Sequence, residues 1–285
     1  MGSDGSPRTL ISVVVTVRNE ERCLGQLLET LLVQEPPFEV VLVDSESRDR
    51  TLEIANSYAR AHPALLRIFS QSGSRGIGRN RGVREARGAF VAFTDGDCFA
   101  DSRWLHTMRE GLETTPVVAG RTVVVGKPAY GALERVELFQ SGYDVTYPTC
   151  NLAFHRDLFE RLGGFDPRFI TAEDIDLNLR AVRAGAAIRY LPEAVIYHHK
   201  RATFIRFLFQ AFWNGYGRKQ LTEKQGSLWG RYRMGRLLTG QRTPLALFRL
   251  AAAIAGYVTR ILTGGSGRLT PPRERSAPAG ATPAR

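Results

Sequence analysis

The fold is constrained most by a repeated pattern in which a short apolar run is followed by polar residues and then by an amphipathic segment. Residues 10–17 read LISVVVTV, and residues 38–43 and 90–94 are apolar runs of the same kind. Such β-branched runs are typical of strands buried on both faces of a parallel sheet. Their alternation with helical patterns predicts an α/β fold with a doubly wound, mostly parallel sheet flanked by helices.

The same patterns place the expected elements along the chain. Strands are expected at residues 10–17, 38–43, 65–69, 90–94, 117–125, 149–154, 188–191 and 194–197. Helices are expected at residues 23–33, 51–61, 104–112, 132–139, 156–161, 203–216 and 244–262, with another from residue 173. Gly120 is expected to break its strand, and residues 73–88, rich in Gly and Arg, to form a loop running into a short helix.

Two carboxylates follow the apolar run at residues 90–94. Asp95 and Asp97 are separated only by Gly96, and residues two apart on an extended chain point the same way. Carboxylate oxygens are the ligands that Mg²⁺ and Mn²⁺ prefer in proteins. An Asx-rich turn is the alternative, because Asp and Gly are also the commonest turn residues.

Polar side chains also follow the earlier strands. Arg18 comes directly after residues 10–17, and Asp44 directly after residues 38–43. Ligands of open parallel sheets bind beyond the carboxyl ends of the strands. We therefore expect Arg18, Asp44, Asp95 and Asp97 to lie at one edge of the sheet and to face one site.

Three further clusters admit both a functional and a plain interpretation. Arg79 and its neighbours follow a glycine-rich segment, so they either contact phosphate at a helix start or lie in solvent. Glu173, Asp174 and Asp176 lie in one turn at the start of a helix, where acids either stabilise the helix N-terminus or have a function. Three acids in four residues are more than capping of the helix requires. The pair His198-His199 is either a ligand or structural. The glycine spacing at residues 76–82 does not fit a dinucleotide fingerprint, and the segment is not the first strand-to-helix turn, which argues against a Rossmann dehydrogenase.

Net charge divides the chain into two parts. Residues 1–199 carry 23 Lys and Arg against 26 Asp and Glu, a net −3, whereas residues 200–285 carry 16 against 2, a net +14. A segregated basic block indicates an anionic partner such as a membrane surface, phosphate-bearing lipid or nucleic acid, or else a solubilising tail. The three cysteines, few and far apart, argue against a disulfide framework and a cysteine-based metal site, and indicate a reducing cytoplasm. Residues 1–9 lack the apolar core of a signal peptide.

The basic part also contains two apolar segments. Residues 203–216 hold aromatic side chains on most of a helical circumference, which must be buried in protein or bilayer. Residues 244–262 are apolar but interrupted by Arg249 and Arg260, so an interfacial or re-entrant helix is expected rather than a transmembrane span. From residue 264 the composition predicts disorder.

Several of these segments together resemble the successive motifs of glycosyltransferase family 2. They are residues 12–21, 44–51, 76–88, 93–97, 151–166 and 173–174. The resemblance covers roughly residues 10–200 and is more specific than any one motif. It implies a GT-A (Rossmann-like) fold, a nucleotide-sugar donor, a divalent cation (Mg²⁺ or Mn²⁺) held at Asp-X-Asp, and inversion at the anomeric carbon.

The resemblance also implies roles for individual residues. The catalytic base would be Asp174, and the metal ligands would be Asp95, Asp97 and His198. The donor would contact Thr16, Val17, Arg18, Glu20, Asp44, Ser45, Arg79, Asn80 and Asp95, and the acceptor side would include Trp104, Asn151, Gly164 and Glu173. The chain departs from the family at Asp44-Ser45-Glu46, where two adjacent aspartates and a glycine are frequent. His198 is preferred to His199 because it follows its strand directly.

The predicted organisation and function follow. Residues 1–9 form a flexible N-terminus, 10–200 a catalytic domain with a donor half (10–100) and an acceptor half (101–200), 201–263 a helical membrane-associating region, and 264–285 a disordered tail. The predicted enzyme is an inverting glycosyltransferase of cell-envelope glycan or glycolipid synthesis, acting on a hydroxyl or lipid phosphate at the cytoplasmic face of the membrane, or in the cytoplasm.

Three alternatives remain. The first is a polyprenyl-phosphate sugar synthase. A sugar nucleotidyltransferase would carry a glycine-rich, lysine-bearing signature after the first strand, which residues 18–21 lack. A nucleic-acid-binding protein is disfavoured because the aromatic residues follow helical spacing without a recognition module, so no nucleic-acid partner is expected.

Overall fold

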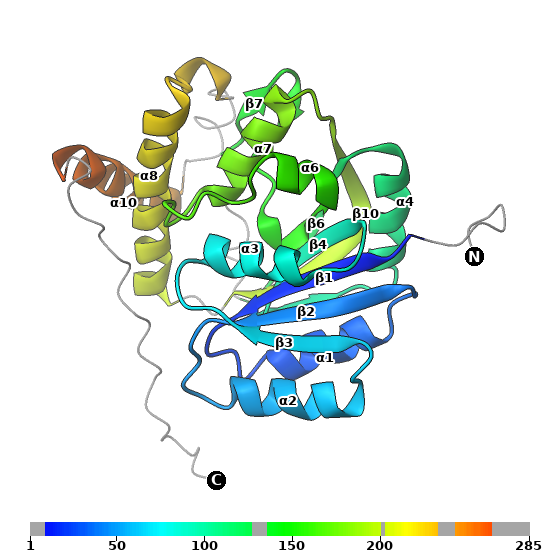
Figure 1. Ribbon diagram of the computed structural model, residues 1–285. Coiled ribbons are helices and arrows are strands. Elements are labelled where there is room, and N and C mark those ends of the chain that lie inside the picture. The colour runs from blue at the N-terminus through cyan, green and yellow to red at the C-terminus, as the bar shows by residue number, and fades with distance from the viewer. Residues whose placement is uncertain (1–8, 127–135, 201–202, 233–242, 264–285) are drawn as a thin grey trace, which may run out of the picture.

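A central eight-stranded sheet with helices on both faces organises the computed structural model, which describes residues 9–126, 136–200, 203–232 and 243–263 (Figure 1). In spatial order the strands are β3 (Leu66–Ser70), β2 (Phe38–Asp44), β1 (Ile11–Val17), β4 (Phe90–Asp95), β9 (Leu152–His155), β6 (Val117–Gly126), β10 (Ile188–Lys200) and β5 (Cys98–Ala100). The mostly parallel α/β sheet predicted from the sequence is confirmed.

The register of the sheet brings the strand ends together. β1 runs parallel to both β2 and β4, with Val17 opposite Asp44 and Thr16 opposite Asp95. The polar residues that follow these strands therefore meet at one edge, as expected. β9 is antiparallel to β4 and β6 and joins the two parallel parts of the sheet.

The helices cover the sheet in two layers. They are α1 (Leu24–Leu32), α2 (Thr51–Ala61), α3 (Arg75–Glu85), α4 (Trp104–Thr114), α6 (Arg156–Arg161), α7 (Glu173–Arg183), α8 (Phe204–Gln225) and α10 (Pro244–Leu262), with 3₁₀ turns at Thr149–Asn151 and Trp229–Arg231. One apolar core lies under α1, α2 and α4 and includes Leu27 and Trp104. The other lies under α3, α6 and α7 and includes Val83 and Phe165. Each fully buried large side chain contributes about 1.5–3 kcal/mol.

The segment at residues 73–88 is more regular than predicted. Instead of a loop with a short helix, residues 75–85 form the continuous helix α3. Its glycines have a packing reason, because a Cβ at Gly82 would overlap the side chain of Val14 in β1. Small residues on this face let the backbone of α3 lie directly on the sheet.

Other departures concern strand boundaries. β6 is not broken at Gly120, where a Cβ would overlap the carbonyl of Ala194. The two strands expected between residues 188 and 197 form one strand, β10, with an irregularity between Leu191 and Val195. The segment at residues 149–154 begins with a 3₁₀ turn before β9. The short strand β5 was not anticipated, because three residues carry too little pattern.

The strands β7 (Phe139–Gln140) and β8 (Tyr143–Asp144) pair as an antiparallel hairpin that forms a second, two-stranded sheet. Half of the helix expected at residues 132–139 falls outside the described residues, and the described half, residues 136–139, is not helical but leads into β7. The flexible N-terminus expected at residues 1–9 and the disordered tail expected from residue 264 also fall outside them, apart from Thr9.

Helices α8 and α10 form a crossing pair at one side of the molecule (Figure 1). A Cβ at Gly215 would overlap the backbone of Ala253, and one at Gly256 would overlap that of Phe212, so glycine on both helices permits backbone contact. By length and composition α10 is long and apolar enough to cross a membrane, with a mean hydropathy of 1.6 and only 11% of that window buried.

Candidate active site

A buried arginine joins the carboxyl end of the sheet to the start of α7. Arg79 of α3 is 3% exposed. Its Nη2 donates to Asp95 Oδ1 and its Nη1 to Glu173 Oε1, both at 2.8 Å. Burial opposes the charge on Arg79, but the two carboxylates outweigh it and raise its pKa. Both terminal nitrogens are thus engaged within the protein, and Arg79 fixes the two acids relative to each other.

Asp95 and Asp97 lie at the end of β4 with different partners. Burial disfavours ionised Asp95, but Arg79 and then Arg75 lower its pKa overall, so the carboxylate is charged. Asp97 Oδ2 lies 3.1 Å from Nε2 of His198 on β10. The side chains of Asp97 and His198 are 30% and 27% exposed. Both therefore remain open to a small ligand from solvent.

The structure separates the two histidines that sequence alone left interchangeable. His198 faces Asp97, and although burial opposes its charge, this hydrogen bond raises the pKa of His198 to about 9. His199 points elsewhere, with its Nε2 2.8 Å from Gln26 Oε1 and its ring against Phe99. Only His198 of the pair lies beside the carboxylates at the end of β4.

By their chemistry, the carboxylates of Asp95 and Asp97 suit a hard divalent cation, with His198 beside Asp97, although the ligand atoms of these three residues do not gather within 4.8 Å in the described structure. Two carboxylates and an imidazole nitrogen are ligands that Mn²⁺ and Mg²⁺ accept. Glycine is required between the aspartates, because a Cβ at Gly96 would lie 2.8 Å from Val17 Cγ1 and 3.0 Å from Glu20 Cγ. The loop after β1 therefore closes tightly over the backbone that carries both acids.

Asp174 has an environment unlike that of its neighbours. Its Oδ1 accepts from the backbone N–H of Ile175 at 2.8 Å, and no side chain in the described part of the protein donates to it. Burial, followed by the charge of Glu173, raises the pKa of Asp174 to about 6, against the opposing effects of Ile175, Arg79 and Arg218. A carboxylate with a pKa near the working pH is suited to general base catalysis.

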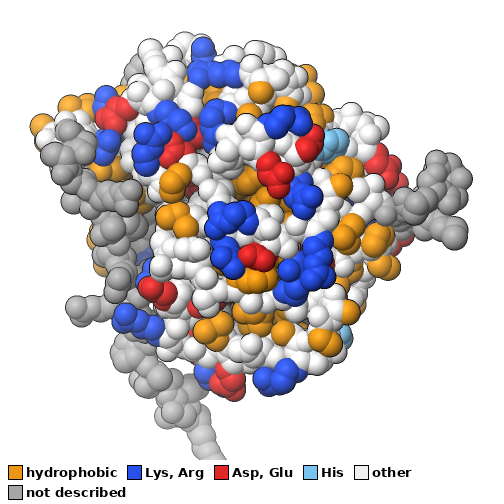
Figure 2. Space-filling model, viewed as in Figure 1, with side chains coloured by type: hydrophobic (Ala, Val, Ile, Leu, Met, Phe, Trp, Pro, Cys, Tyr) orange, Lys and Arg blue, Asp and Glu red, His pale blue; other side chains and the backbone are white. Residues whose placement is uncertain are grey.

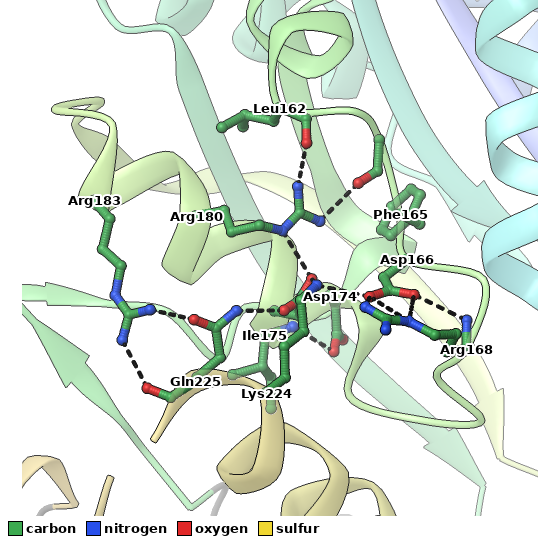
Figure 3. Close-up of polar contacts among 12 residues, drawn as sticks. Leu162, Phe165, Asp166, Arg168, Asp174, Ile175, Arg180, Arg183, Lys224 and Gln225 are labelled. Carbon is green, nitrogen blue, oxygen red and sulfur yellow. Dashed lines mark hydrogen bonds and ion pairs between the residues drawn. The ribbon is translucent and has the colours of Figure 1, made fainter. Parts of the chain in front are cut away.

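Asp176, in the same turn, serves the fold. Asp176 is fully buried and accepts from Arg180, Lys224 and Gln225 at 2.9, 2.9 and 2.6 Å. These three partners are labelled in Figure 3. Lys224 also contacts Asp166, so the network links α7, the loop before it and the end of α8. The N-cap position itself is Ala172, which carries no side-chain hydrogen bond, but all three acids lie in the first turn of α7 and Asp174 Oδ1 accepts from the N–H of Ile175 there. The capping interpretation therefore holds for Asp174 in part, beside the catalytic one.

The loops after β1 and β2 form the neighbouring part of the edge. Asp44 is 1% exposed, with Oδ2 accepting from Ser47 N at 3.1 Å. Its Oδ1 is buried and has no hydrogen-bond partner among the described residues. An orphaned buried acceptor costs about 1–3 kcal/mol unless a ligand satisfies it. Ser45 and Thr16 lie next to Gly78 of α3, at 3.6 and 3.2 Å from the Cβ it lacks.

The remaining donor-side residues differ in exposure. Val17 is buried at the end of β1, Arg18 is exposed, and the N–H of Glu20 donates to Thr51 Oγ1 at 2.7 Å. Basic side chains gather over α3 on the face drawn in Figure 2, as expected where an anionic ligand approaches.

Two predicted residues position a loop. The side-chain amide of Asn80 donates to the carbonyl of Phe165 at 2.7 Å and accepts from its N–H at 2.9 Å. Gly164 has φ +68 and no room for a Cβ, which would lie 2.6 Å from Asn80 Oδ1. Both residues therefore shape the turn that leads into α7.

Two other predictions require correction. Trp104 and Asn151, expected on the acceptor side, are fully buried, and Trp104 Nε1 donates to Asn151 Oδ1 at 2.8 Å. The amide nitrogen of Asn151 bonds the carbonyls of Arg121 and Ala194, both at 3.0 Å. These side chains tie strands together and do not face an acceptor.

Sequence reasoning missed residues that distant segments bring to the site. Arg218 of α8 acts on Asp174, and Arg75 acts on Asp95. The ligand atoms of Cys98, Cys150 and His198 also lie within 4.8 Å of one another. Arg218 belongs to no motif and the two cysteines are far apart in the sequence, so no local signal marked them, whereas Arg75 lies in the Gly- and Arg-rich segment 73–88 but was not singled out.

Comparisons with protein families agree with this geometry. A family model described as glycosyl transferase family 2 matches residues 12–163, and one described as glycosyl transferase family group 2 matches residues 136–267. Glycosyltransferase AglE of Haloferax volcanii is 30% identical over 226 residues, 74% of this chain and 73% of the relative. A glucosyl-dolichyl phosphate glucuronosyltransferase of the same organism is 26% identical over 245 residues, 73% and 76% of the two chains.

Other relatives are matched over less of their length. The chain spans 60% of the uncharacterized glycosyltransferase EpsJ of Bacillus subtilis, at 27% identity over 205 residues, 65% of this chain. It spans 51% of the probable glycosyltransferase YdaM of the same organism.

Solved structures share the fold. Mannosyltransferase PcManGT from Pyrobaculum calidifontis, in complex with GDP-Man and Mn²⁺, superposes with a TM-score of 0.60 at 22% identity, covering 91% of this chain and 77% of that one. Residues 1–349 of Staphylococcus aureus TarS in complex with UDP-GlcNAc give 0.57 at 19% identity, covering 89% and 90%.

Proposed function

Because this chain belongs to glycosyltransferase family 2, we propose that it transfers a sugar from a nucleotide-sugar donor to an acceptor hydroxyl with inversion at the anomeric carbon. One observation carries the proposal: Asp174 is a partly buried carboxylate with a pKa of about 6 beside the donor-side edge of the sheet. A single displacement needs one base opposite the leaving group, and no second carboxylate as nucleophile.

The donor binds at the ends of β1, β2 and β4 in this proposal. The unsatisfied Oδ1 of Asp44 accepts a hydrogen bond from the nucleobase of the donor. Thr16, Ser45 and the loop through Glu20 surround the nucleoside. Complexes of GDP-Man and UDP-GlcNAc with proteins of the same fold support a nucleotide-sugar as the donor class.

Asp95, Asp97 and His198 would hold the divalent cation, Mg²⁺ or Mn²⁺. When bound, it neutralises the negative charge that develops on the leaving diphosphate. Arg79 keeps Asp95 ionised, and Asp97 keeps the imidazole of His198 directed at the same place. Mn²⁺ in the complex of PcManGT supports this cofactor class.

The proposed transfer is a single displacement at the anomeric carbon. The acceptor oxygen forms a bond to the anomeric carbon, the bond to the diphosphate breaks, and the acceptor proton moves to Asp174. Glu173, held by Arg79, raises the proton affinity of Asp174 as a neighbouring negative charge. Glu173 therefore has a positioning and tuning role rather than a separate catalytic one.

The base favours a hydroxyl acceptor over a lipid phosphate. The second ionisation of a phosphate monoester has a pKa near 6, so at neutral pH such an acceptor has little need of a base. A sugar hydroxyl does need one. A polyprenyl-phosphate sugar synthase is accordingly the second candidate, and the relative named as acting on glucosyl-dolichyl phosphate supports a lipid-linked acceptor in either case.

The acceptor and the membrane are proposed to meet at α8 and α10. Exposed apolar side chains there are Phe204, Ile205, Phe209, Leu247, Phe248, Leu250, Ile254, Val258, Ile261 and Leu262. Figure 2 includes apolar side chains at the edge formed by α10. With a net +14 over residues 200–285, such a surface favours peripheral binding at the anionic cytoplasmic face, where cell-envelope glycans are assembled.

A donor screen tests the function. Nucleotide-sugars with Mn²⁺ are assayed by thermal shift, since a ligand that binds only the folded state raises the melting temperature. The donor found is then incubated with lipid-linked sugar acceptors, and the anomeric configuration of the product is read by NMR. Inversion is expected. Retention of configuration, or no stabilisation by any nucleotide-sugar, would contradict the proposal.

A further inference from the structure

Two buried thiols lie against the imidazole of the proposed cation site. Cys98 comes from β5, Cys150 from the 3₁₀ turn before β9, and His198 from β10. The ligand atoms of all three lie within 4.8 Å of one another, and both cysteines are free. Cys98 and His198 are direct partners in the antiparallel pairing of β5 and β10, so their side chains point to the same face of the sheet.

A fourth ligand group is adjacent. Asp97 Oδ1 lies 3.9 Å from Cys98 Sγ, and Asp97 Oδ2 lies 3.1 Å from His198 Nε2. Two thiols and an imidazole form a three-ligand group, and the adjacent carboxylate of Asp97 would bring the number of ligands to the four that Zn²⁺ takes in proteins. Hard cations select oxygen donors, whereas thiolates select Zn²⁺ and other thiophilic ions.

The burial of the thiols also bears on metal binding. Cys98 is fully buried and Cys150 is 5% exposed, and Cys150 lies 3.9 Å from the hydroxyl of Thr122. Two thiolates there would be costly without compensating charge, which a divalent cation supplies. Asp97 and His198 are partly exposed and form the side from which an ion can enter.

We propose that Cys98, Cys150 and His198, with Asp97 as fourth ligand, form a site for a thiophilic divalent cation such as Zn²⁺. On binding, each thiol and the imidazolium of His198 release a proton to solvent, and no group is oxidised or reduced. Since Asp97 and His198 also belong to the proposed hard-cation set, occupancy by Zn²⁺ prevents Mn²⁺ or Mg²⁺ from binding there. This second part rests on the proposed function, whereas the metal site itself does not.

The site is tested first without nucleotide or acceptor. The full chain is stripped of metal, kept reduced with a phosphine and titrated with Co²⁺, whose thiolate charge-transfer absorption reports sulfur ligation. One Co²⁺ per chain is expected, displaced by Zn²⁺. Cys98→Ser and Cys150→Ser should lose the absorption, and Cys23→Ser, a buried cysteine at the start of α1, should keep it.

The outcomes are decisive. No thiolate absorption in the wild-type chain, or absorption retained in both Cys98→Ser and Cys150→Ser, would overturn the site. Circular dichroism checks that each variant is folded. If either serine variant unfolds, Cys150→Ala is used in its place. The metal content of each protein after gel filtration provides a second readout of metal binding.

Competition is tested by calorimetry of nucleoside diphosphate binding in Mn²⁺. One equivalent of Zn²⁺ should weaken this binding at least 10-fold in the wild-type chain, and in Cys150→Ser the loss should be much smaller. Unchanged affinity in Zn²⁺-loaded wild-type chain would overturn the competition while the metal site stands. Absence of Mn²⁺-dependent binding in metal-free protein would instead contradict the proposed function, and the Co²⁺ titration would still decide the site.

Discussion

At the scale of the residue, the three acids that open α7 differ because their partners differ. Glu173 is tied to Arg79, and Asp176 is enclosed by Arg180 and the end of α8. Asp174 alone lacks a side-chain donor among the described residues, and its pKa is raised to about 6. The sequence showed the acid cluster but not this division, since the partners come from distant segments. The candidate base is therefore distinguished by a carboxylate that no described side chain occupies with a hydrogen bond, and not by the presence of an acid alone.

Replacing Asp174 by Asn separates catalysis from stability. Asn has nearly the same shape but cannot accept the acceptor proton, so turnover should fall by about 10²–10⁴ with donor affinity unchanged. Asp176→Asn is the matched control, because it disrupts a fully buried ion-pair network. It should lower the melting temperature and affect turnover only through stability. Near wild-type turnover in Asp174→Asn, measured by product formation, would remove Asp174 as the base.

The raised pKa of Asp174 also predicts two pH dependences. Turnover should decline as pH falls through about 6, because the protonated carboxyl is no base. A folded-state pKa above the unfolded value means that ionisation costs stability above pH 6, and that this cost disappears as pH falls towards 4. Asp174→Asn should therefore gain on the order of 1–3 kcal/mol at pH 8 and almost nothing at pH 4. Denaturant unfolding at both pH values measures this, and a pH-independent difference would contradict it.

Asp97 and His199 provide a contrast between cation binding and packing. Asp97→Ala should abolish Mn²⁺-dependent binding of nucleoside diphosphate, measured by calorimetry, with little change in melting temperature because the carboxylate is partly exposed. His199→Ala removes the neighbouring imidazole, which contacts Gln26, and should leave cation dependence intact. Equal loss in the two variants would indicate general disruption of β10 rather than a ligand role for Asp97.

At the scale of the element, local pattern was sufficient where an element buries its own face. The strands at residues 10–17 and 38–43 and the helix at 51–61 were placed to within a residue, because periodicity reflects burial directly. Local pattern did not predict the structure correctly where contacts with a neighbouring element determine the conformation. Gly82 is tolerated within α3 because β1 lies against it, and β5 exists only through its pairing with β10.

The cysteines show the same limit of local pattern. Their separation along the chain argued against a cysteine-based metal site, yet β5 and the 3₁₀ turn bring Cys98 and Cys150 to one imidazole. Likewise Trp104 and Asn151 were assigned to an acceptor from the resemblance alone, and only the fold reveals that they bond each other inside the core. Long-range pairing thus decides which motif residues are available to ligands.

The crossing of α8 and α10 can be tested at Gly256. Gly256→Leu places a side chain against the carbonyl of Phe212 and should cost about 1–3 kcal/mol, lowering the melting temperature and exposing α10 to protease. Ala255→Leu is the control on the same helix, because its position is exposed, and should change stability by less than about 0.5 kcal/mol. Equal effects would mean that the two helices do not depend on close contact.

At the scale of the whole molecule, the helix pair and the candidate base are mechanically linked. Thr171, just before α7, donates to the carbonyl of Trp213 at 2.8 Å, and a Cβ at Gly217 would overlap Thr171. The proposed division at residue 200 therefore separates the chain by composition, but α8 completes the surroundings of Asp174. A membrane surface that binds α8 and α10 would therefore also orient the candidate active site towards a lipid-linked acceptor in that membrane.

The last prediction concerns that surface. Liposome flotation of the full chain should give stronger binding to anionic than to neutral vesicles, because each Arg near an anionic surface contributes about 1 kcal/mol. Attraction of this origin should weaken as salt rises. Phe209→Asp combined with Ile254→Asp, two exposed positions on α8 and α10, should reduce binding without loss of fold, since neither side chain is in the core. Asp174→Asn is the matched control and should float like the wild type. If liposome binding is unchanged by lipid charge, by salt and by the double substitution, α8 and α10 do not form the membrane-binding face.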